Sequence, residues 1–151
     1  MTYSVNFANY TIGEDAYQNV REVCRHYGKK ALLIGGELAL KAGKEKLIQA
    51  LASEIQIVDT VLFGTDCMYA RMEELAEHAK KCGADMIFGM GGGKALDTAK
   101  GTAEKAGLPV FTFPTIAATC AATTALSVVY KEDGNFDSFY FYDKLVPRSV
   151  S

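Results

Sequence analysis

GMGGGKALDTAK, residues 89–100, gives the strongest indication of this chain's architecture. The apolar run Met86–Phe88 precedes it and predicts a strand, and a segment of small residues from Lys94 to Ala106 predicts a helix. Consecutive glycines at such a junction let the backbone turn tightly and bring its N–H groups close to a ligand. The unpaired N–H groups and the positive dipole end of the helix suit a phosphate, and Lys94 adds a cation.

The same junction has a plainer interpretation. Its spacing is neither GxGxxG nor a Walker A motif, which has Ser or Thr after the lysine. It could therefore be a tight strand-to-helix turn with no ligand, although phosphate binding is favoured. Asp97 falls in the first turn of the predicted helix, where it either interacts with the helix dipole or holds the glycine loop or a cofactor. Both roles for Asp97 stay open.

Outward from this junction, strand-like and helix-like segments alternate. Strands are predicted at 31–34, 55–63 and 110–113, and helices over 16–27, 38–52 and 68–82, with Gly28 and Gly83 as helix ends and Gly43 as a weak point or break. This alternation predicts an α/β fold around a parallel sheet, and the wholly apolar strands fit burial on both faces. Further along, β-prone runs at 126–130 and 136–142 flank Asp133-Gly134, which predicts a β-hairpin.

The composition excludes several classes of protein. The 151 residues carry a net charge of −2, so nothing creates the positive field that nucleic-acid binding requires. No apolar run approaches the ~20 residues of a membrane span, and the N-terminus lacks a signal-peptide pattern. Four cysteines without a CxxC pair argue against a zinc ribbon or disulfide scaffold, and His26 and His78 are expected to be solvated. We expect a cytoplasmic chain with free thiols that binds neither nucleic acid nor membranes.

Two further segments could carry chemistry. Residues 113–124 follow a predicted strand and hold only small or hydroxyl-bearing side chains after Ile116, so they either let a cofactor approach closely or form a packed linker. Cys120 within them is not expected to be a nucleophile, because no His is near in sequence. Glu37 follows a strand end, where an acidic residue can grip a ribose, but it could equally start the next helix.

Together these segments resemble the iron-containing alcohol dehydrogenase superfamily, in its glycerol dehydrogenase-like branch. The resemblance rests on GMGGGKALDTAK at 89–100, PTIAATCAATTALSVVY at 114–130, the hairpin after it, and IGGELALKAG at 34–43. It implies a Rossmann-like three-layer domain over residues 1–143, with a mostly parallel sheet and a C-terminal β-hairpin, that binds NAD or NADP. Residues 144–151 are expected to be a tail or a remnant of truncation.

The resemblance also implies the site residues. Those expected to bind the cofactor are Gly36, Gly91, Gly92, Gly93, Lys94, Asp97, Thr115, Thr124, Leu126 and Tyr130. Among them, the backbone of Gly92, Gly93 and Lys94 is expected to face the pyrophosphate. The ribose-binding Asp of NAD-dependent members falls at Gly36, so NADP becomes plausible, with Lys41 or Lys44 pairing with its 2′-phosphate.

The substrate is expected beside Cys120, where glycerol dehydrogenases carry an Asp. A Cys at this position resembles the hydroxycarboxylate dehydrogenases of the same branch. A 2-oxo acid such as 2-oxobutanoate or 2-oxoglutarate is therefore favoured over glycerol or another small alcohol.

Family members continue into an all-helical domain that supplies an Asp and two His as ligands for Zn or Fe. Those ligands are absent from this chain, and none of its residues is expected to be catalytic. The chain is therefore expected to bind nucleotide without turning over substrate. The alternative is a non-catalytic nucleotide- or phosphate-binding module. An apolar face exposed where the helical domain packs predicts a homo-oligomer.

Overall fold

The computed structural model describes residues 10–11, 20–22, 24–115, 126–141 and 148–150. In the described part of the chain, six parallel strands form one sheet and two antiparallel strands form a hairpin beside it. The elements are β1 (Tyr10–Thr11), β2 (Lys30–Gly35), α2 (Glu37–Leu51), β3 (Gln56–Leu62), α3 (Tyr69–Cys82), β4 (Met86–Gly91), α4 (Gly93–Ala106), β5 (Val110–Pro114), β6 (Leu126–Tyr130), β7 (Phe136–Phe141) and β8 (Arg148–Val150).

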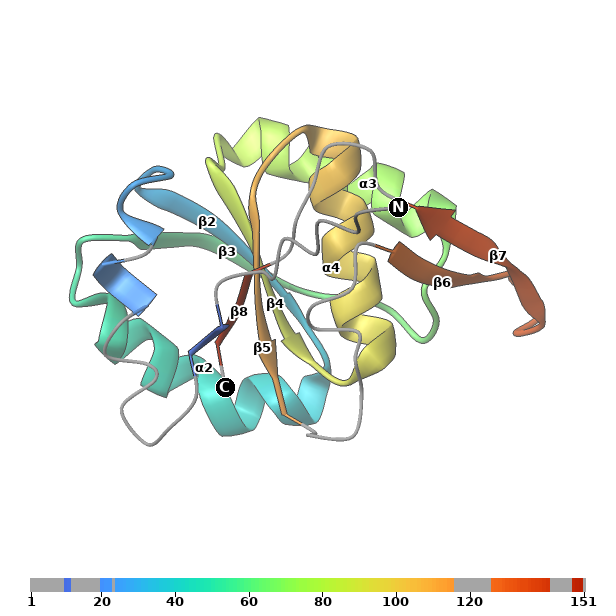
Figure 1. The fold of residues 1–151 in the computed structure, drawn as a ribbon, viewed down its shortest axis with the longest axis horizontal. Coiled ribbons are helices and arrows are strands. Elements are labelled where there is room, and N and C mark those ends of the chain that lie inside the picture. Colours follow the sequence, from blue (N-terminus) through green and yellow to red (C-terminus); the bar gives the residue numbers. More distant parts are fainter. Residues whose placement is uncertain (1–9, 12–19, 23, 116–125, 142–147, 151) are drawn as a thin grey trace, which may run out of the picture.

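The large sheet has helices on both of its faces. Figure 1 shows α2 on one face and α3 with α4 on the other. Successive side chains of a strand point to opposite faces, so Leu33 packs with Leu47 of α2, whereas Leu32 packs with Leu75 of α3. Burial on both faces explains why β2 and β4 are almost wholly apolar. The expected three-layer α/β fold with a mostly parallel sheet is confirmed.

The strand order is β1-β8-β5-β4-β2-β3. The consecutive strands β5, β4, β2 and β3 are therefore neighbours, with β3 at the edge of the sheet. Because they are parallel, their carboxyl ends all lie on the same side of the sheet. Ligands of open α/β sheets bind outside this edge. Each of the loops that leave these four strands can therefore contribute to one site.

Helix α4 is the central helix of its layer. It is buried from Ala95 to Ala103 because its small residues let the sheet, α3 and β6 approach closely. The buried hydroxyls of Thr98 and Thr102 donate to the main-chain oxygens one turn earlier, at 2.8 Å in both cases. These bonds satisfy polar groups that would otherwise be costly inside the protein.

The hairpin β6–β7 confirms the prediction from the Asp-Gly pair. It pairs Leu126 with Phe141 at its open end, and Gly134 adopts φ +86° in the turn. Val129 packs with Cys67 and Met72, and the main-chain N–H of Tyr130 donates to the oxygen of Cys67 at 2.8 Å. The hairpin is thereby fixed to the segment that joins β3 to α3.

Three details differ from the sequence pattern or add to it. The break expected at Gly43 is wrong, because α2 runs through it and burial of Leu47 and Leu51 offsets the ~1 kcal/mol that an internal glycine costs. Of the helix expected over 16–27, the described residues 20–22 and 24 have helical backbone. Arg148–Val150, in the segment expected to be a tail, forms β8 and pairs with β1 and β5.

No helix in the described ranges has the length and apolar character needed to cross a membrane.

Candidate functional site

A cleft of about 440 Å³ opens at the carboxyl edge of the sheet. Residues at the ends of all four neighbouring strands line it. Gly36 follows β2, Phe63 follows β3, Gly91 ends β4 and Thr115 follows β5. Gly92, Gly93, Lys94, Glu37 and Leu38 are also among the lining residues. The structure therefore gathers six of the residues expected to bind a cofactor, Gly36, Gly91, Gly92, Gly93, Lys94 and Thr115, around one hollow.

The glycine at the end of β4 has a conformation that other residues rarely adopt. Gly91 has φ +146°, and a Cβ atom there would lie 2.9 Å from the Cβ of Ala95. Its main-chain oxygen accepts a hydrogen bond from the N–H of Thr115 at 3.1 Å. The Gly36 N–H donates in turn to the oxygen of Met90 at 3.1 Å. The loops after β2, β4 and β5 are thus tied together by their backbones at the floor of the cleft.

Two helices begin at this cleft. Gly36 is the N-cap of α2 and Gly92 is the N-cap of α4, and neither helix has a side chain that caps its first turn. Both caps line the cleft. The first N–H groups of a helix have no intrahelical partner, and each helix start carries about half a positive charge. Two such ends at one cleft favour an anionic group there.

Lys94 adds a full positive charge to the rim. Its ammonium nitrogen lies 2.5 Å from Oδ1 of Asp66 and 5.0 Å from the ring centre of Tyr130. The hydrogen bond to Asp66 raises the pKa of Lys94, so the side chain stays charged. Tyr130, which belongs to the hairpin, thereby lies beside the lysine at the start of α4, but it is not among the residues that line the cleft.

Asp97 lies behind the loop, within the protein. Its side chain is buried, and Oδ1 lies 3.0 Å from the Nζ atom of Lys100, whose side chain is fully buried. The buried hydroxyl of Ser127 donates to the main-chain oxygen of Asp97 at 2.6 Å. Asp97 is not among the residues that line the cleft. The helix begins at Gly93, so Asp97 lies just past the first turn and not within it as expected, and its contacts are with the next turn of α4 and with the hairpin.

Of the remaining expected site residues, the structure describes Leu126 but not Thr124 or Cys120. Leu126 opens β6, and its backbone pairs with Phe141. Thr124 and Cys120 lie outside the described residues. Sequence reasoning did not identify Phe63 and Asp66. The only local signal for them was their position at the end of the strand predicted over 55–63 and just beyond it, which parallel topology brings to the same edge.

Comparison with known proteins gives a consistent result. The family model for iron-containing alcohol dehydrogenase matches residues 8–150. A glycerol dehydrogenase of Pseudomonas putida is 35% identical over 130 residues, which are 86% of this chain and 36% of that protein. Hydroxycarboxylate dehydrogenase A of Escherichia coli is 38% identical over 116 residues, which are 76% of this chain and 31% of that protein.

A solved structure agrees in fold. The glycerol dehydrogenase of Schizosaccharomyces pombe superposes with a TM-score of 0.81 and is 28% identical, over 95% of this chain and 36% of that one. The chain thus spans about a third of the length of these relatives.

Proposed function

The chain belongs to the iron-containing alcohol dehydrogenase family, and we propose that it forms the nucleotide-binding part of an NAD(P)-dependent dehydrogenase. The relatives it matches are named as dehydrogenases of glycerol and of hydroxycarboxylates. The observation that carries the proposal is the convergence of two uncapped helix starts and a glycine turn on one cleft. A dinucleotide diphosphate is the ligand whose charge and shape best match this arrangement.

Each expected residue then has a distinct role. The backbone N–H groups of Gly92, Gly93 and Lys94 bind the pyrophosphate, and the Lys94 ammonium adds charge attraction. Gly91 has no side chain, so the diphosphate can approach the backbone closely at this point. A Cβ atom there would also collide with Ala95. The apolar side chains of Leu38 and Phe63, both at the cleft, offer a surface for the adenosine part.

Further roles rest on the family pattern. Thr115, Thr124, Leu126 and Tyr130 line the nucleotide and nicotinamide portions of the site. When bound, the nicotinamide supplies the acceptor or donor of hydride, and the chain's own residues bind and orient it. Asp97 acts through its buried contacts in this proposal and positions the glycine loop.

The cofactor we propose is NADP(H). The cleft carries no carboxylate at Gly36, and the adjoining groove is lined by Lys41, Lys44 and Thr60. Lys41 lies 3.5 Å from the carboxylate of Glu37, and both side chains are more than two-thirds exposed, so that contact is easily exchanged for a phosphate. A 2′-phosphate entering this groove meets these two cations, while the carboxylates of Glu37 and Glu45 also line the groove.

The substrate we propose is a small 2-oxo acid or the corresponding 2-hydroxy acid, held beside Cys120. This preference rests on the Cys in the motif at 114–130 and on the similarity to hydroxycarboxylate dehydrogenase A. Among the described residues that line the cleft there is no His or Cys, and Glu37 offers the single carboxylate. These residues do not form the three-ligand site that a catalytic Zn or Fe requires. We therefore propose that the 151 residues alone bind cofactor without turnover.

The direct test is a fluorescence titration of the chain with NADH and with NADPH, with inorganic pyrophosphate as a competitor. Binding of either dinucleotide, reversed by pyrophosphate, is expected. Gly93→Asp places a negative charge at the start of α4 and should abolish binding. Ala106→Asp, the same added charge at the other end of α4, should leave binding intact. No binding of either dinucleotide by the folded chain contradicts the proposal.

We also propose that the isolated chain forms a homo-oligomer. Phe136 and Phe139 on the hairpin are more than half exposed and stack with ring centres 5.2 Å apart. Leu38 is 80% exposed at the cleft. Exposed apolar groups of this size favour association. Light scattering that gives a monomer mass at high concentration contradicts this proposal.

A further inference from the structure

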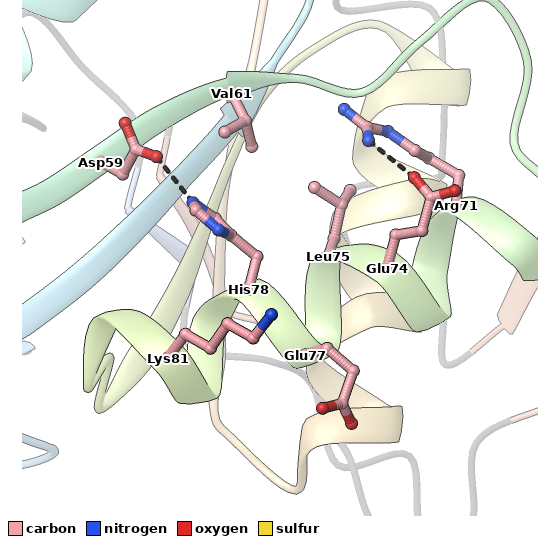
Figure 2. Close-up of a pocket in the computed structure, with 8 residues that line it drawn as sticks. All are labelled: Asp59, Val61, Arg71, Glu74, Leu75, Glu77, His78 and Lys81. Carbon is pink, nitrogen blue, oxygen red and sulfur yellow. Dashed lines mark hydrogen bonds and ion pairs between the residues drawn. The ribbon is translucent and has the colours of Figure 1, made fainter.

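Three side chains of metal-ligating type meet on the face of the sheet that α3 covers. Asp59 belongs to β3, and His78 and Cys82 belong to α3. One ligand atom from each lies within 4.8 Å of the other two. His78 and Cys82 are four positions apart, so they lie on the same side of the helix, one turn from each other. Figure 2 shows the His78 ring directed at the carboxylate of Asp59.

The imidazole is at the centre of this cluster. Its Nε2 atom lies 2.6 Å from Oδ2 of Asp59 and 3.5 Å from Sγ of Cys82. The His78 side chain is 38% exposed, as a surface residue is, but its ring is also held between two other polar groups, which the sequence did not indicate. The hydrogen bond from His78 also lowers the pKa of the Asp59 carboxyl. The carboxylate is thus kept in its ionised form.

The distances suit a tetrahedral cation. Zinc binds sulfur at about 2.3 Å and imidazole nitrogen at about 2.0–2.1 Å, which puts those two ligand atoms about 3.6 Å apart across a tetrahedral angle. The observed Nε2–Sγ distance of 3.5 Å matches this value. The carboxylate oxygen has to move outward by less than 1 Å, roughly, for the cation to replace the proton between it and Nε2. The Asp59 side chain is 43% exposed and has room to do so.

We propose that Asp59, His78 and Cys82 form a binding site for a thiophilic divalent cation such as Zn²⁺. One carboxylate, one imidazole and one thiolate are the ligand types that such ions select. The fourth position opens into the adjoining groove of about 330 Å³, where water completes the coordination. Cation binding replaces protons: the S–H bond of Cys82 is broken and its proton goes to solvent, and the imidazole proton moves from Nε2 to Nδ1 by exchange with solvent, so that the neutral ring keeps one proton.

This site is separate from the nucleotide cleft. The groove beside it is lined by Asp59, Val61, Arg71, Glu74, His78 and Lys81 among others, and it shares none of its lining residues with the cleft. Asp59 pairs with Leu32 in the middle of β3, away from the carboxyl edge. A cation here therefore does not touch bound nucleotide. It links the edge strand β3 to α3 and stabilises the fold.

The chain supplies its own controls for this inference. His26 is exposed on another segment and has no part in the cluster. Cys24 and Cys67 are fully buried, and burial raises the pKa of the Cys67 thiol to about 12. Among the described residues, Cys82 is thus the thiol that a cation can reach.

The experiment uses the full chain, stripped with a chelator and titrated with Co²⁺ and then with Zn²⁺. A thiolate-to-cobalt charge-transfer band is expected, displaced by Zn²⁺, together with a rise in Tm on addition of Zn²⁺. Cys82→Ser should remove the band, and His78→Gln should weaken binding at least about tenfold, as loss even of groups behind metal ligands typically does. Both variants should lose the Tm response.

His26→Gln should behave as the wild type in each measurement. A band that persists in Cys82→Ser, or Zn²⁺ affinity unchanged in His78→Gln, overturns the proposal. Circular dichroism establishes that each variant is folded. NADH binding that is equal with and without Zn²⁺ is expected, which keeps this test independent of the proposed nucleotide function.

Discussion

The ammonium nitrogen of Lys94 lies 2.5 Å from a carboxylate oxygen of Asp66, which is 28 positions earlier in the chain. The same ammonium lies over the ring of Tyr130, so three separate segments converge on one charge. Lys94 is at the start of α4, on the rim of the cleft. Its charge is therefore fixed in place before any ligand arrives, and Asp66 partly neutralises it.

The two members of this ion pair should have opposite effects on dinucleotide affinity when each is replaced. Lys94→Met removes an attractive charge and should weaken binding about tenfold, in line with the 1.5–3 kcal/mol typical of hydrogen bonds to charged groups, reduced by exposure. Asp66→Asn removes a competing carboxylate and should tighten binding by roughly a factor of three. Fluorescence titration at low and high salt measures both. Weaker binding in Asp66→Asn contradicts this prediction.

The preference for NADPH proposed above should be reversed by a carboxylate at Gly36. This residue has φ −83°, and a Cβ atom there approaches only Phe63, at 3.8 Å, so larger side chains fit. Gly36→Asp adds a carboxylate at the N-cap of α2 and should weaken NADPH binding at least tenfold relative to NADH, an effect of about 1.4 kcal/mol. Gly36→Asn has the same shape without the charge and should leave the preference for NADPH in place.

Gly91 and Gly36 should respond differently to alanine. Gly91→Ala forces a Cβ atom to within 2.9 Å of Ala95 at φ +146° and should cost about 1–3 kcal/mol of unfolding free energy. Gly36→Ala meets no such contact and should change stability by less than ~1 kcal/mol. Urea denaturation followed by circular dichroism compares the two variants. Equal stability of both variants would show that the glycine turn is not constrained as described.

Replacing one member of the buried pair of Asp97 and Lys100 should cost more stability than expected from the effect of replacing both. Asp97→Ala removes the carboxylate 3.0 Å from a buried ammonium, and Lys100→Met removes the ammonium beside a buried carboxylate, so each should cost about 3–5 kcal/mol. The double variant removes both charges and should cost less than the sum of the two. Additive losses in a double-mutant cycle, measured by urea unfolding, contradict a coupled pair.

The sequence was sufficient for the order of the elements between residues 30 and 141. Strands at 31–34, 86–88 and 110–113 were predicted because short apolar runs next to glycine or proline that alternate with helical patterns are typical of buried strands of a parallel sheet. The glycine loop was predicted to lie at a strand-to-helix junction for the same reason. These features depend only on residues that are close together in the sequence, so they can be predicted before the fold is known.

Other features depend on which distant segments meet. Nothing near Lys100 marks it as buried, since lysines are usually exposed, and its burial follows from packing of α4 between the sheet and the hairpin. The contact of Asp66 with Lys94 and of Asp59 with His78 likewise requires strands and helices to be assembled first. The insertion of Arg148–Val150 into the sheet was not foreseen, because three residues carry too little pattern to indicate a strand.

Strand β8 lies between β5 and β1, and within the described residues β1 pairs with β8 alone. Tyr10 and Thr11 therefore have no place to dock until Ser149 and Val150 have been synthesised and have joined β5. Closing a loop of that length is entropically costly and slow. During translation, strand β1 consequently cannot join the nascent sheet through β8 until ribosomal synthesis has passed Val150.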